Sequence, residues 1–316
     1  MKIGILFSGQ GAHKPGMGLD LLVDPLFAQT VAEASAATGL DITTILRSEH
    51  GELDQTANVQ PALVTVSYGL YRMLRRDLPK LPVAGMVGLS LGEYAALLAD
   101  KAVSAADGFK LLADRGRYMQ TDADAQASGL AALVDPQEKV VDQVLATSAV
   151  QVANYNSPHQ LVIGGPVAEL KTAVSQLKTA KAAKKIVILR VSGAFHTPLF
   201  NNARQKMHDR LATVTFATPQ VPVISNTTVY PFTADNLSEI LERQLAVPTH
   251  FGEDLQYLID HEKIDQTLEI GPGRASRLRA ANPAQSARSA DLAWSAGDVW
   301  RQRGRQSCGR RLAHGP

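Results

Sequence analysis

The chain has 316 residues, of which 45% are hydrophobic and 20% charged, so it has enough apolar surface for one large domain and too few charges for a disordered chain. Residues 274–316 hold nine arginines, two aspartates and no lysine, a balance of +7, so the formal charge of +2 leaves 2 − 7 = −5 for residues 1–273. The basic character therefore lies in the C-terminal segment, and the main body offers no basic face for nucleic acid.

The first part of the chain alternates buried strands with helices. Lys2–Phe7 is predicted to be a buried strand that leads into the glycine-rich loop SGQGAHKPGMG. Gln60–Leu78 has the apolar spacing of a helix, and Val83–Gly88 and Leu91–Asp100 are predicted to be a strand followed by a helix. A further helix is expected to begin after Ser104.

Residues 128–192 follow a different pattern. Strands are predicted at GLAALVD, VQVANYN, QLVIGG and KKIVILRV, and helices at PQEKVVDQVLATS and PVAELKTAVSQLKTAK. Their order along the chain is βαββαβ, which is typical of a ferredoxin-like subdomain. Strands at VPVISN and DQTLEI, with helices at Asn236–Ala246 and Phe251–Glu262 between them, then continue the first pattern.

The predicted fold class is α/β with a mostly parallel sheet, because strands alternate with helices outside the insert. We expect one large subdomain formed by residues 1–127 and 193–273, a ferredoxin-like small subdomain at 128–192, and an Arg-rich tail at 274–316. The tail shows no sustained helical or strand period. Three explanations stay open for it: a flexible basic extension, a shifted reading frame near the end of the gene, or a terminal helix that the pattern does not reveal.

Membrane, secretion and metal signals are weak in this sequence. No apolar run approaches the roughly 18 residues that span a bilayer, and MKIGILFSGQG is predicted to be a first strand and not a secretory signal. The single cysteine, Cys308, excludes an intrachain disulfide and a cysteine-based metal cluster. We therefore expect a cytoplasmic protein with no metal site.

Ser90 lies in GLSLG at residues 88–92, between a predicted strand and a predicted helix. This is the context of a nucleophile elbow, in which small residues two before and two after the serine let the backbones pass. The pattern alone is also compatible with a plain turn capped by Ser90. A nucleophilic serine needs a base, and among the eight histidines His196 lies in a loop of small residues, VSGAFHTPLF, directly after the insert.

Six segments together resemble the malonyl-CoA:acyl carrier protein transacylases of fatty-acid synthesis. In chain order they are FSGQGAHKPGMG, GLSLGEYAA, RGRYMQ at 115–120, ANYNSPHQLVIGG at 153–165, GAFHTPLF at 193–200 and LEIGPG at 268–273. They are distributed from residue 7 to residue 273, so the resemblance extends over most of residues 1–273. The resemblance implies an α/β-hydrolase-like large subdomain with a ferredoxin-like insert, which agrees with the pattern of strands and helices.

The resemblance also implies roles for the matching residues. Ser90 would attack malonyl-CoA, and His196 would take the hydroxyl proton. The backbone N–H groups of Gln10 and Leu91 would bind the oxyanion. A backbone carbonyl of the segment VPTHF, near His250, would orient the catalytic histidine, and His250 itself is expected at the substrate site.

Other positions bear on specificity. Arg115 would bind the malonate carboxylate as a fork, with a solvated helix residue as the alternative. Phe195 is an aromatic residue at a position where, in related acyltransferases, such a ring goes with a malonyl preference. Asn154 and Asn156 would line the cleft, or equally cap the turn that they flank. Leu89 stands where the family usually has histidine, so we expect retuned activity and not its loss.

The implied partners are malonyl-CoA and the phosphopantetheine thiol of an acyl carrier protein, linked by an acyl-serine intermediate. No nucleic acid, membrane, metal or redox cofactor is implied, and G-x-G-x-x-G is absent after the first strand. Three alternatives stay open: a trans-acting polyketide acyltransferase, a serine thioesterase or hydrolase with an acidic third member, and a non-catalytic scaffold that binds a carrier protein.

Overall fold

The computed structural model describes residues 1–272 and 292–294. In this part of the chain a five-stranded sheet has the order β7-β2-β1-β8-β9, and each neighbouring pair is parallel. Its strands are β1 (Ile3–Phe7), β2 (Val83–Gly88), β7 (Val223–Ile224), β8 (Gln266–Ile270) and β9 (Leu292–Trp294).

The central strand β1 is buried along its whole length, as expected for a parallel strand covered on both faces. It pairs in register with β2 up to Phe7↔Gly88 and with β8 up to Phe7↔Ile270. The carboxyl ends of these strands therefore lie at one edge of the sheet. Side chains that follow Phe7, Gly88, Ile224 and Ile270 in the sequence are brought together there, where open α/β sheets bind ligands.

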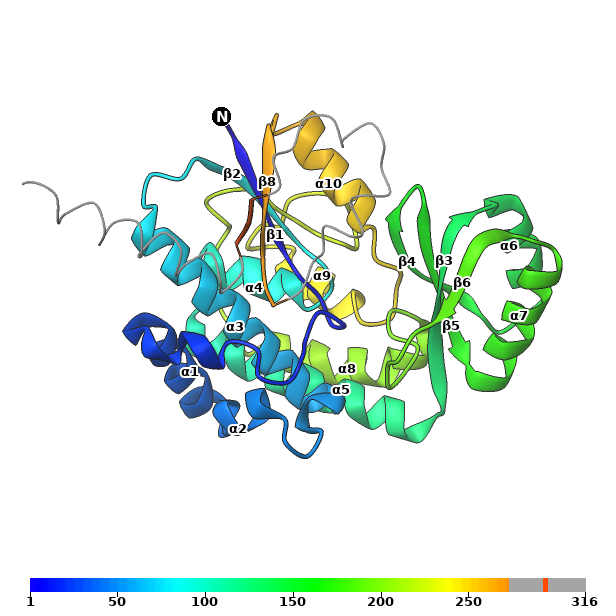
Figure 1. Ribbon diagram of the computed structural model, residues 1–316, viewed down its shortest axis with the longest axis horizontal. Helices are drawn as coiled ribbons and strands as arrows, with labels where there is room; N and C mark the ends of the chain where they lie inside the picture. Colours follow the sequence, from blue (N-terminus) through cyan, green and yellow to red (C-terminus); the bar gives the residue numbers. More distant parts are fainter. Residues whose placement is uncertain (273–291, 295–316) are drawn as a thin grey trace, which may run out of the picture.

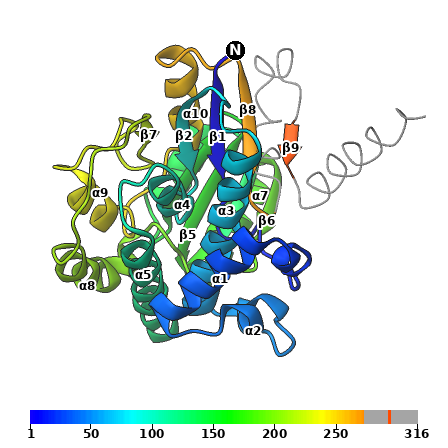
Figure 2. The same cartoon turned by 90° about the vertical axis from the view of Figure 1, so that its left-hand side faces the viewer.

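Helices cover both faces of this sheet, and the alternation of side chains along β1 sets which core each residue joins. Ile5 and Phe7 belong to the core shared with α3 (Thr56–Asp77) and α4 (Gly92–Ala99), whereas Leu6 packs with α10 (Phe251–Asp260). In Figure 2 the long helix α3 lies in front of the sheet. The result is a three-layer arrangement.

Further helices complete the large subdomain: α1 (Pro25–Thr38), α2 (Ile42–Arg47), α5 (Ala105–Ala125), α8 (Asn201–Leu211), α9 (Leu237–Arg243), and the short 3₁₀ turns η1 (Leu19–Val23), η2 (Glu52–Asp54) and η3 (Pro198–Phe200). The sequence analysis named no helix at α1, α2 or α8. In α8 only Ala203, Met207 and Leu211 are buried, a narrow apolar stripe in an otherwise polar sequence.

The second sheet is antiparallel and is formed within residues 128–188. Its order is β4-β5-β3-β6, with strands β3 (Ser128–Pro136), β4 (Gln151–Ser157), β5 (Gln160–Pro166) and β6 (Ala183–Ile188). The helices α6 (Glu138–Leu145) and α7 (Val167–Thr179) lie on the side away from the parallel sheet (Figure 1). The predicted fold class, a mostly parallel α/β sheet with an inserted βαββαβ unit, is therefore confirmed.

Backbone pairing ties the two sheets together. Thr249, just before α10, forms a parallel bridge with Asn154 of β4. The Tyr155 N–H donates to the Thr249 carbonyl at 2.7 Å, and the Thr249 N–H donates to the Ala153 carbonyl at 3.0 Å. This contact fixes the small subdomain against the strand ends of the large one, so a cleft forms between them.

The predicted tail lies outside the described residues except for β9, a strand that the sequence analysis did not anticipate. Over the two described ranges, no helix combines the length and the apolar character needed to cross a bilayer.

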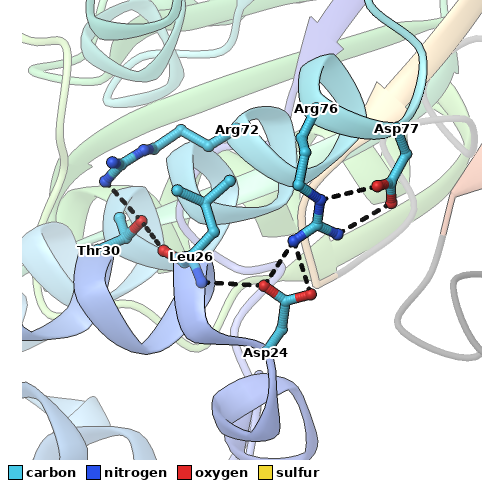
Figure 3. Close-up of polar contacts among 6 residues, drawn as sticks. All are labelled: Asp24, Leu26, Thr30, Arg72, Arg76 and Asp77. Carbon is cyan, nitrogen blue, oxygen red and sulfur yellow. Dashed lines mark hydrogen bonds and ion pairs between the residues drawn. The ribbon is translucent and has the colours of Figure 1, made fainter.

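A buried carboxylate anchors α1 to α3 (Figure 3). Asp24 caps α1 by accepting a hydrogen bond from the Leu26 N–H at 3.0 Å, and both of its oxygens accept from the Arg76 guanidinium at 2.8 Å. One turn further back on α3, Arg72 donates to the Thr30 hydroxyl at 2.9 Å. Two arginines of α3 therefore hold the first turns of α1.

The Asp24 carboxylate should contribute to stability only while it is ionised. Burial opposes ionisation, but hydrogen bonds from Arg76 and from the Leu26 N–H outweigh it and hold the pKa of Asp24 below its ordinary value. A lowered folded-state pKa gives stability above the unfolded pKa that is lost as the pH falls through the folded one. We expect Asp24→Asn to lower the free energy of unfolding by about 1–3 kcal/mol at pH 7, and by progressively less below about pH 4.

Denaturant unfolding of both proteins across this pH range measures the difference. The exposed Asp20, four residues earlier, provides the control, because Asp20→Asn should change stability by less than about 0.5 kcal/mol. A destabilisation of Asp24→Asn that stays constant from pH 7 to pH 3 would contradict the ionic origin.

Candidate active site

Ser90 lies on a sharp turn between β2 and α4 and has a φ of 56°, in the left-handed region that side chains other than glycine rarely adopt. Gly88 and Gly92 flank the turn at close range. A Cβ on Gly88 would lie 2.0 Å from the Gly92 carbonyl carbon, and one on Gly92 would lie 2.7 Å from the Phe7 carbonyl oxygen. Both positions therefore need glycine, and the turn holds Ser90 at the edge where the strands end.

His196 faces this serine. Its Nε2 lies 2.7 Å from Ser90 Oγ, and its Nδ1 lies 2.7 Å from the main-chain carbonyl oxygen of Gln244. A carbonyl can only accept, so Nδ1 carries the proton and Nε2 is left to accept the Ser90 hydroxyl proton. Burial, reinforced by the nearby positive charge of Arg115, lowers the pKa of His196 to about 4, so the imidazole is neutral at physiological pH.

The prediction that the segment VPTHF supplies the carbonyl that orients His196 is wrong. The segment VPTHF does not supply it, because Thr249 is paired with β4 and the His250 N–H donates to the Asn226 carbonyl at 2.9 Å. Gln244 follows the last residue of α9, where a helix has carbonyl groups without intrahelical partners. His250 is not among the described residues that line the cleft, and its imidazole contacts Glu253 at 2.9 Å.

Arg115 reaches the same point from α5. Its side chain is buried, and it donates to Gln60 Oε1 at 2.5 Å, to Gln244 Oε1 at 2.8 Å and to Ser90 Oγ at 3.2 Å. Burial lowers its pKa, but the guanidinium remains protonated at neutral pH. A positive charge with a planar fork therefore lies beside the Ser90 hydroxyl, and this position excludes the solvated-helix alternative.

The two N–H groups expected to bind an oxyanion are open. Within residues 1–272 and 292–294, neither the Leu91 N–H nor the Gln10 N–H has a hydrogen-bond partner. The Ser90 N–H, in contrast, donates to Asn226 Oδ1 at 2.7 Å. Leu91 immediately precedes α4, so its N–H lies at the positive end of the helix dipole.

A cavity of about 800 Å³ opens over these groups, between the two subdomains. Ser90, Arg115 and His196 lie in its wall, and the other lining residues include Gln10, Leu89, Asn154, Asn156, Gln160 and Phe195. The Asn154 amide donates to Thr249 Oγ1 at 2.7 Å. Asn156 donates to Gln160 Oε1 at 3.0 Å, and its own Oδ1 has no partner among the described residues. The structure thus brings Ser90, His196, Arg115, Phe195 and both asparagines to one cavity.

The sequence analysis missed the buried groups behind this site. Gln60 and Gln244 contact Arg115, whereas Asn226 and Glu93 contact the Ser90 turn and each other. Burial raises the pKa of Glu93 to about 8. Only the position of Glu93 in the first turn after the serine could have indicated a role, because nothing in the sequence distinguishes these amides from surface amides.

Comparison with known proteins identifies the family. The model of the acyl transferase domain matches residues 5–297. The chain belongs to the acyl transferase family.

Individual relatives agree with this assignment. The malonyl CoA-acyl carrier protein transacylase of Escherichia coli is 34% identical over 280 residues, which cover 86% of this chain and 90% of the relative. The crystal structure of MCAT from Streptococcus pneumoniae superposes with a TM-score of 0.86 at 32% identity, covering 96% of this chain and all of that one. A malonyl-transacylase, PlMCAT, bound to the type II polyketide synthase acyl carrier protein AntF, gives 0.86 at 30% identity, with 93% and 96% covered.

The lowered pKa of His196 predicts how this acyl transferase should respond to acid. Because the base form of His196 persists down to a pKa of about 4, the reaction of Ser90 with a fluorophosphonate should keep its neutral-pH rate down to about pH 5. Labelling rates followed by intact-protein mass spectrometry measure the profile. Ser90→Ala must not be labelled, and His208→Gln, which changes an exposed histidine, must leave the midpoint in place. A midpoint near 6.5, the value of ordinary imidazole, would contradict this picture.

Proposed function

We propose that this acyl transferase moves a malonyl group from malonyl-CoA to the phosphopantetheine thiol of an acyl carrier protein in fatty-acid biosynthesis. The observation that carries the proposal is the buried Arg115, whose guanidinium lies 3.2 Å from Ser90 Oγ. A buried cation beside the nucleophile suits an acyl group that ends in a carboxylate. The names of the relatives support the same reaction.

In the first half of the reaction, Ser90 Oγ attacks the thioester carbonyl while His196 Nε2 takes the hydroxyl proton. The carbonyl oxygen becomes an oxyanion, which the Leu91 and Gln10 N–H groups would bind. Loss of one such donor typically costs about 2.7–4 kcal/mol of barrier. The tetrahedral species then expels the coenzyme A sulfur, which receives the proton from His196, and the malonyl group stays on Ser90 as an ester.

The second half reverses these steps with a different thiol. His196 takes the proton of the phosphopantetheine thiol, and the sulfur attacks the malonyl ester. The Ser90 oxygen leaves and regains its proton from the imidazole. Because His196 is the base in both halves of the reaction, malonyl-CoA and the carrier protein thiol occupy the site one after the other. Protein groups supply every proton and every stabilised charge in this scheme, so we propose that it needs no metal or redox cofactor.

The geometry favours transfer over the hydrolase alternative. A serine hydrolase of the usual triad type has a carboxylate behind its histidine, whereas His196 donates to the Gln244 carbonyl. A thioesterase for uncharged acyl chains does not need an arginine that binds a carboxylate. Anchoring the malonyl carboxylate on Arg115 would also hold the ester where water is poorly placed to attack.

The polyketide alternative differs only in the acceptor. The complex of PlMCAT with AntF is a type II polyketide example, and this chain resembles it almost as well as the Escherichia coli protein. The two versions would use the same chemistry at Ser90, His196 and Arg115, so only the preferred carrier protein separates them. In either case we propose that the protein acts in the cytoplasm.

Replacing Arg115 should change which acyl group Ser90 accepts. Arg115→Ala is expected to slow malonylation by about 100-fold or more, because two charge-assisted hydrogen bonds are lost, while acetylation from acetyl-CoA slows less or rises. Arg115→Lys should not restore the rate, because an ammonium lacks the fork. Intact-protein mass spectrometry after brief mixing with each thioester measures both adducts.

The matched control for this experiment is Arg117→Ala on the same helix. Arg117 has 65% of its side chain exposed and should leave both rates unchanged. An unchanged ratio of malonyl to acetyl adduct in Arg115→Ala would count against the proposed function.

Phe195 is predicted to exclude a branched acyl group. Its ring lines the cavity and packs against Phe200 at a centroid distance of 5.0 Å, which fixes its position beside His196. We expect Phe195→Ser to lower the kcat/KM ratio of malonyl-CoA over methylmalonyl-CoA by about ten-fold or more, since one methyl group is worth about 1–3 kcal/mol. Phe195→Tyr keeps the ring and should keep the ratio. Equal ratios in all three proteins would show that the ring does not discriminate.

A further inference from the structure

The backbone of Ser90 is held at both of its polar groups by amide side chains from distant parts of the chain. The Ser90 N–H donates to Asn226 Oδ1 at 2.7 Å, and the Ser90 carbonyl accepts from Gln244 Nε2 at 3.1 Å. The same carbonyl also accepts from the Glu93 N–H at 3.0 Å. These contacts hold a residue in an unfavourable left-handed conformation, with a φ of 56°.

The orientation of the side-chain amides of Gln244 and Asn226 is fixed by hydrogen-bond partners that can only donate or only accept. Gln244 must turn its oxygen to Arg115, which only donates, and its nitrogen to the Ser90 carbonyl, which only accepts. Asn226 must turn its oxygen to the Ser90 N–H. Its Nδ2 is therefore forced to face the opposite side, where it needs an acceptor.

Two buried carboxyl groups lie behind these amides, and one of them, Asp254, supplies the acceptor for Asn226 Nδ2. Asp254 Oδ2 accepts from Asn226 Nδ2 at 2.6 Å, and Glu93 accepts from both the Asn226 N–H and Gln244 Nε2. Glu93 and Asp254 are both fully enclosed, and neither is among the described residues that line the cavity. Neither is therefore placed to touch a substrate.

The hydrogen bonds to the Ser90 backbone determine where the Leu91 N–H points. The Ser90 carbonyl, which Gln244 and the Glu93 N–H hold, and the Leu91 N–H belong to one planar trans peptide unit, so fixing the carbonyl fixes the N–H on the opposite side. Asn226 holds the preceding peptide unit through the Ser90 N–H, and the two units meet at the Cα of Ser90. A slight rotation of the unit that carries the Leu91 N–H would move this donor away from the place where an oxyanion forms. Such donors act by being oriented before the reaction.

We propose that Asn226, held in one orientation by Asp254, is a positioning residue that keeps the Ser90 turn in the geometry from which the Leu91 N–H binds the oxyanion. The acid and the amide are complementary: Asn226 must offer one acceptor toward Ser90 and one donor toward Asp254. Exchanging the two side chain types preserves both hydrogen bonds, because a carboxylate at 226 can accept from both the Ser90 N–H and an amide at 254. This inference rests on the proposed function.

The exchange gives a direct test. Asn226→Asp places two carboxyl groups face to face, and we expect kcat to fall at least about ten-fold, with the KM for malonyl-CoA within about two-fold. The loss should deepen as the pH rises, because two facing carboxylates cannot both ionise at low cost. Asp254→Asn should have a mild effect, because its amide can turn its oxygen toward Asn226. The double variant Asn226→Asp/Asp254→Asn should recover kcat to within about three-fold of the wild type.

Asn226→Ala removes the acceptor without burying a charge and should show the same loss of kcat with little change in KM. Asn201→Asp, a change at an exposed asparagine, is the control. Steady-state kinetics, the rate of malonyl-enzyme formation by mass spectrometry and a thermal unfolding curve are measured for each variant. The proposal is overturned if Asn226→Ala keeps wild-type kcat, or if the folded double variant is no better than Asn226→Asp. Failure of the wild type to form a malonyl-enzyme would instead refute the proposed function.

Discussion

The close contact between Gly88 and Gly92 is the constraint on which the site depends. A side chain at Gly88 would overlap the backbone of Gly92, so only a glycine pair lets β2 turn directly into α4. The turn in between forces Ser90 into the left-handed region and places its hydroxyl above the strand ends. The same turn is followed directly by Leu91, whose open N–H lies just before α4. The positions of the Ser90 hydroxyl and of the Leu91 N–H thus follow from one packing requirement.

The electrostatics of the site follow from burial. Arg115 brings a positive charge into the interior, where an unpaired charge is costly, and amide oxygens of Gln60 and Gln244 solvate it. The same charge and the same burial keep His196 neutral, because a second cation nearby would be repelled. Glu93 is close enough to Arg115 to interact with its charge, but burial raises the pKa of Glu93 to about 8, so this carboxyl group is mostly neutral at pH 7. The cavity wall therefore carries a buried positive charge beside a neutral imidazole.

The hydrophobic periodicity of the sequence predicted those strands and helices that have a strong local pattern. The strand Val83–Gly88 was predicted with the bounds that β2 has, and the βαββαβ order of the insert was also found, because short apolar runs and turn signals specify such elements locally. The alanine-rich α1 and the polar α8 lacked a wide apolar stripe and were missed. The residues of the site also fall into a group that the sequence predicted and a group that it did not. Ser90, His196 and Arg115 lie in recognisable segments, whereas Gln244 and Asn226 act through contacts more than 100 residues from Ser90 in sequence, which no local pattern encodes.

The identity of the group behind His196 has a chemical consequence. A carboxylate there would attract a proton to the imidazole and raise its pKa, which the buried site otherwise lowers. It would also lie near Gln244, the residue that contacts Arg115, and would compete with an incoming malonyl carboxylate for the guanidinium. A main-chain carbonyl at the end of α9 orients the ring through one hydrogen bond but adds no charge. Under the proposed function the positive charge of Arg115 is then available to the malonyl carboxylate, so a neutral orienting group and an arginine that binds a carboxylate would belong together in one site.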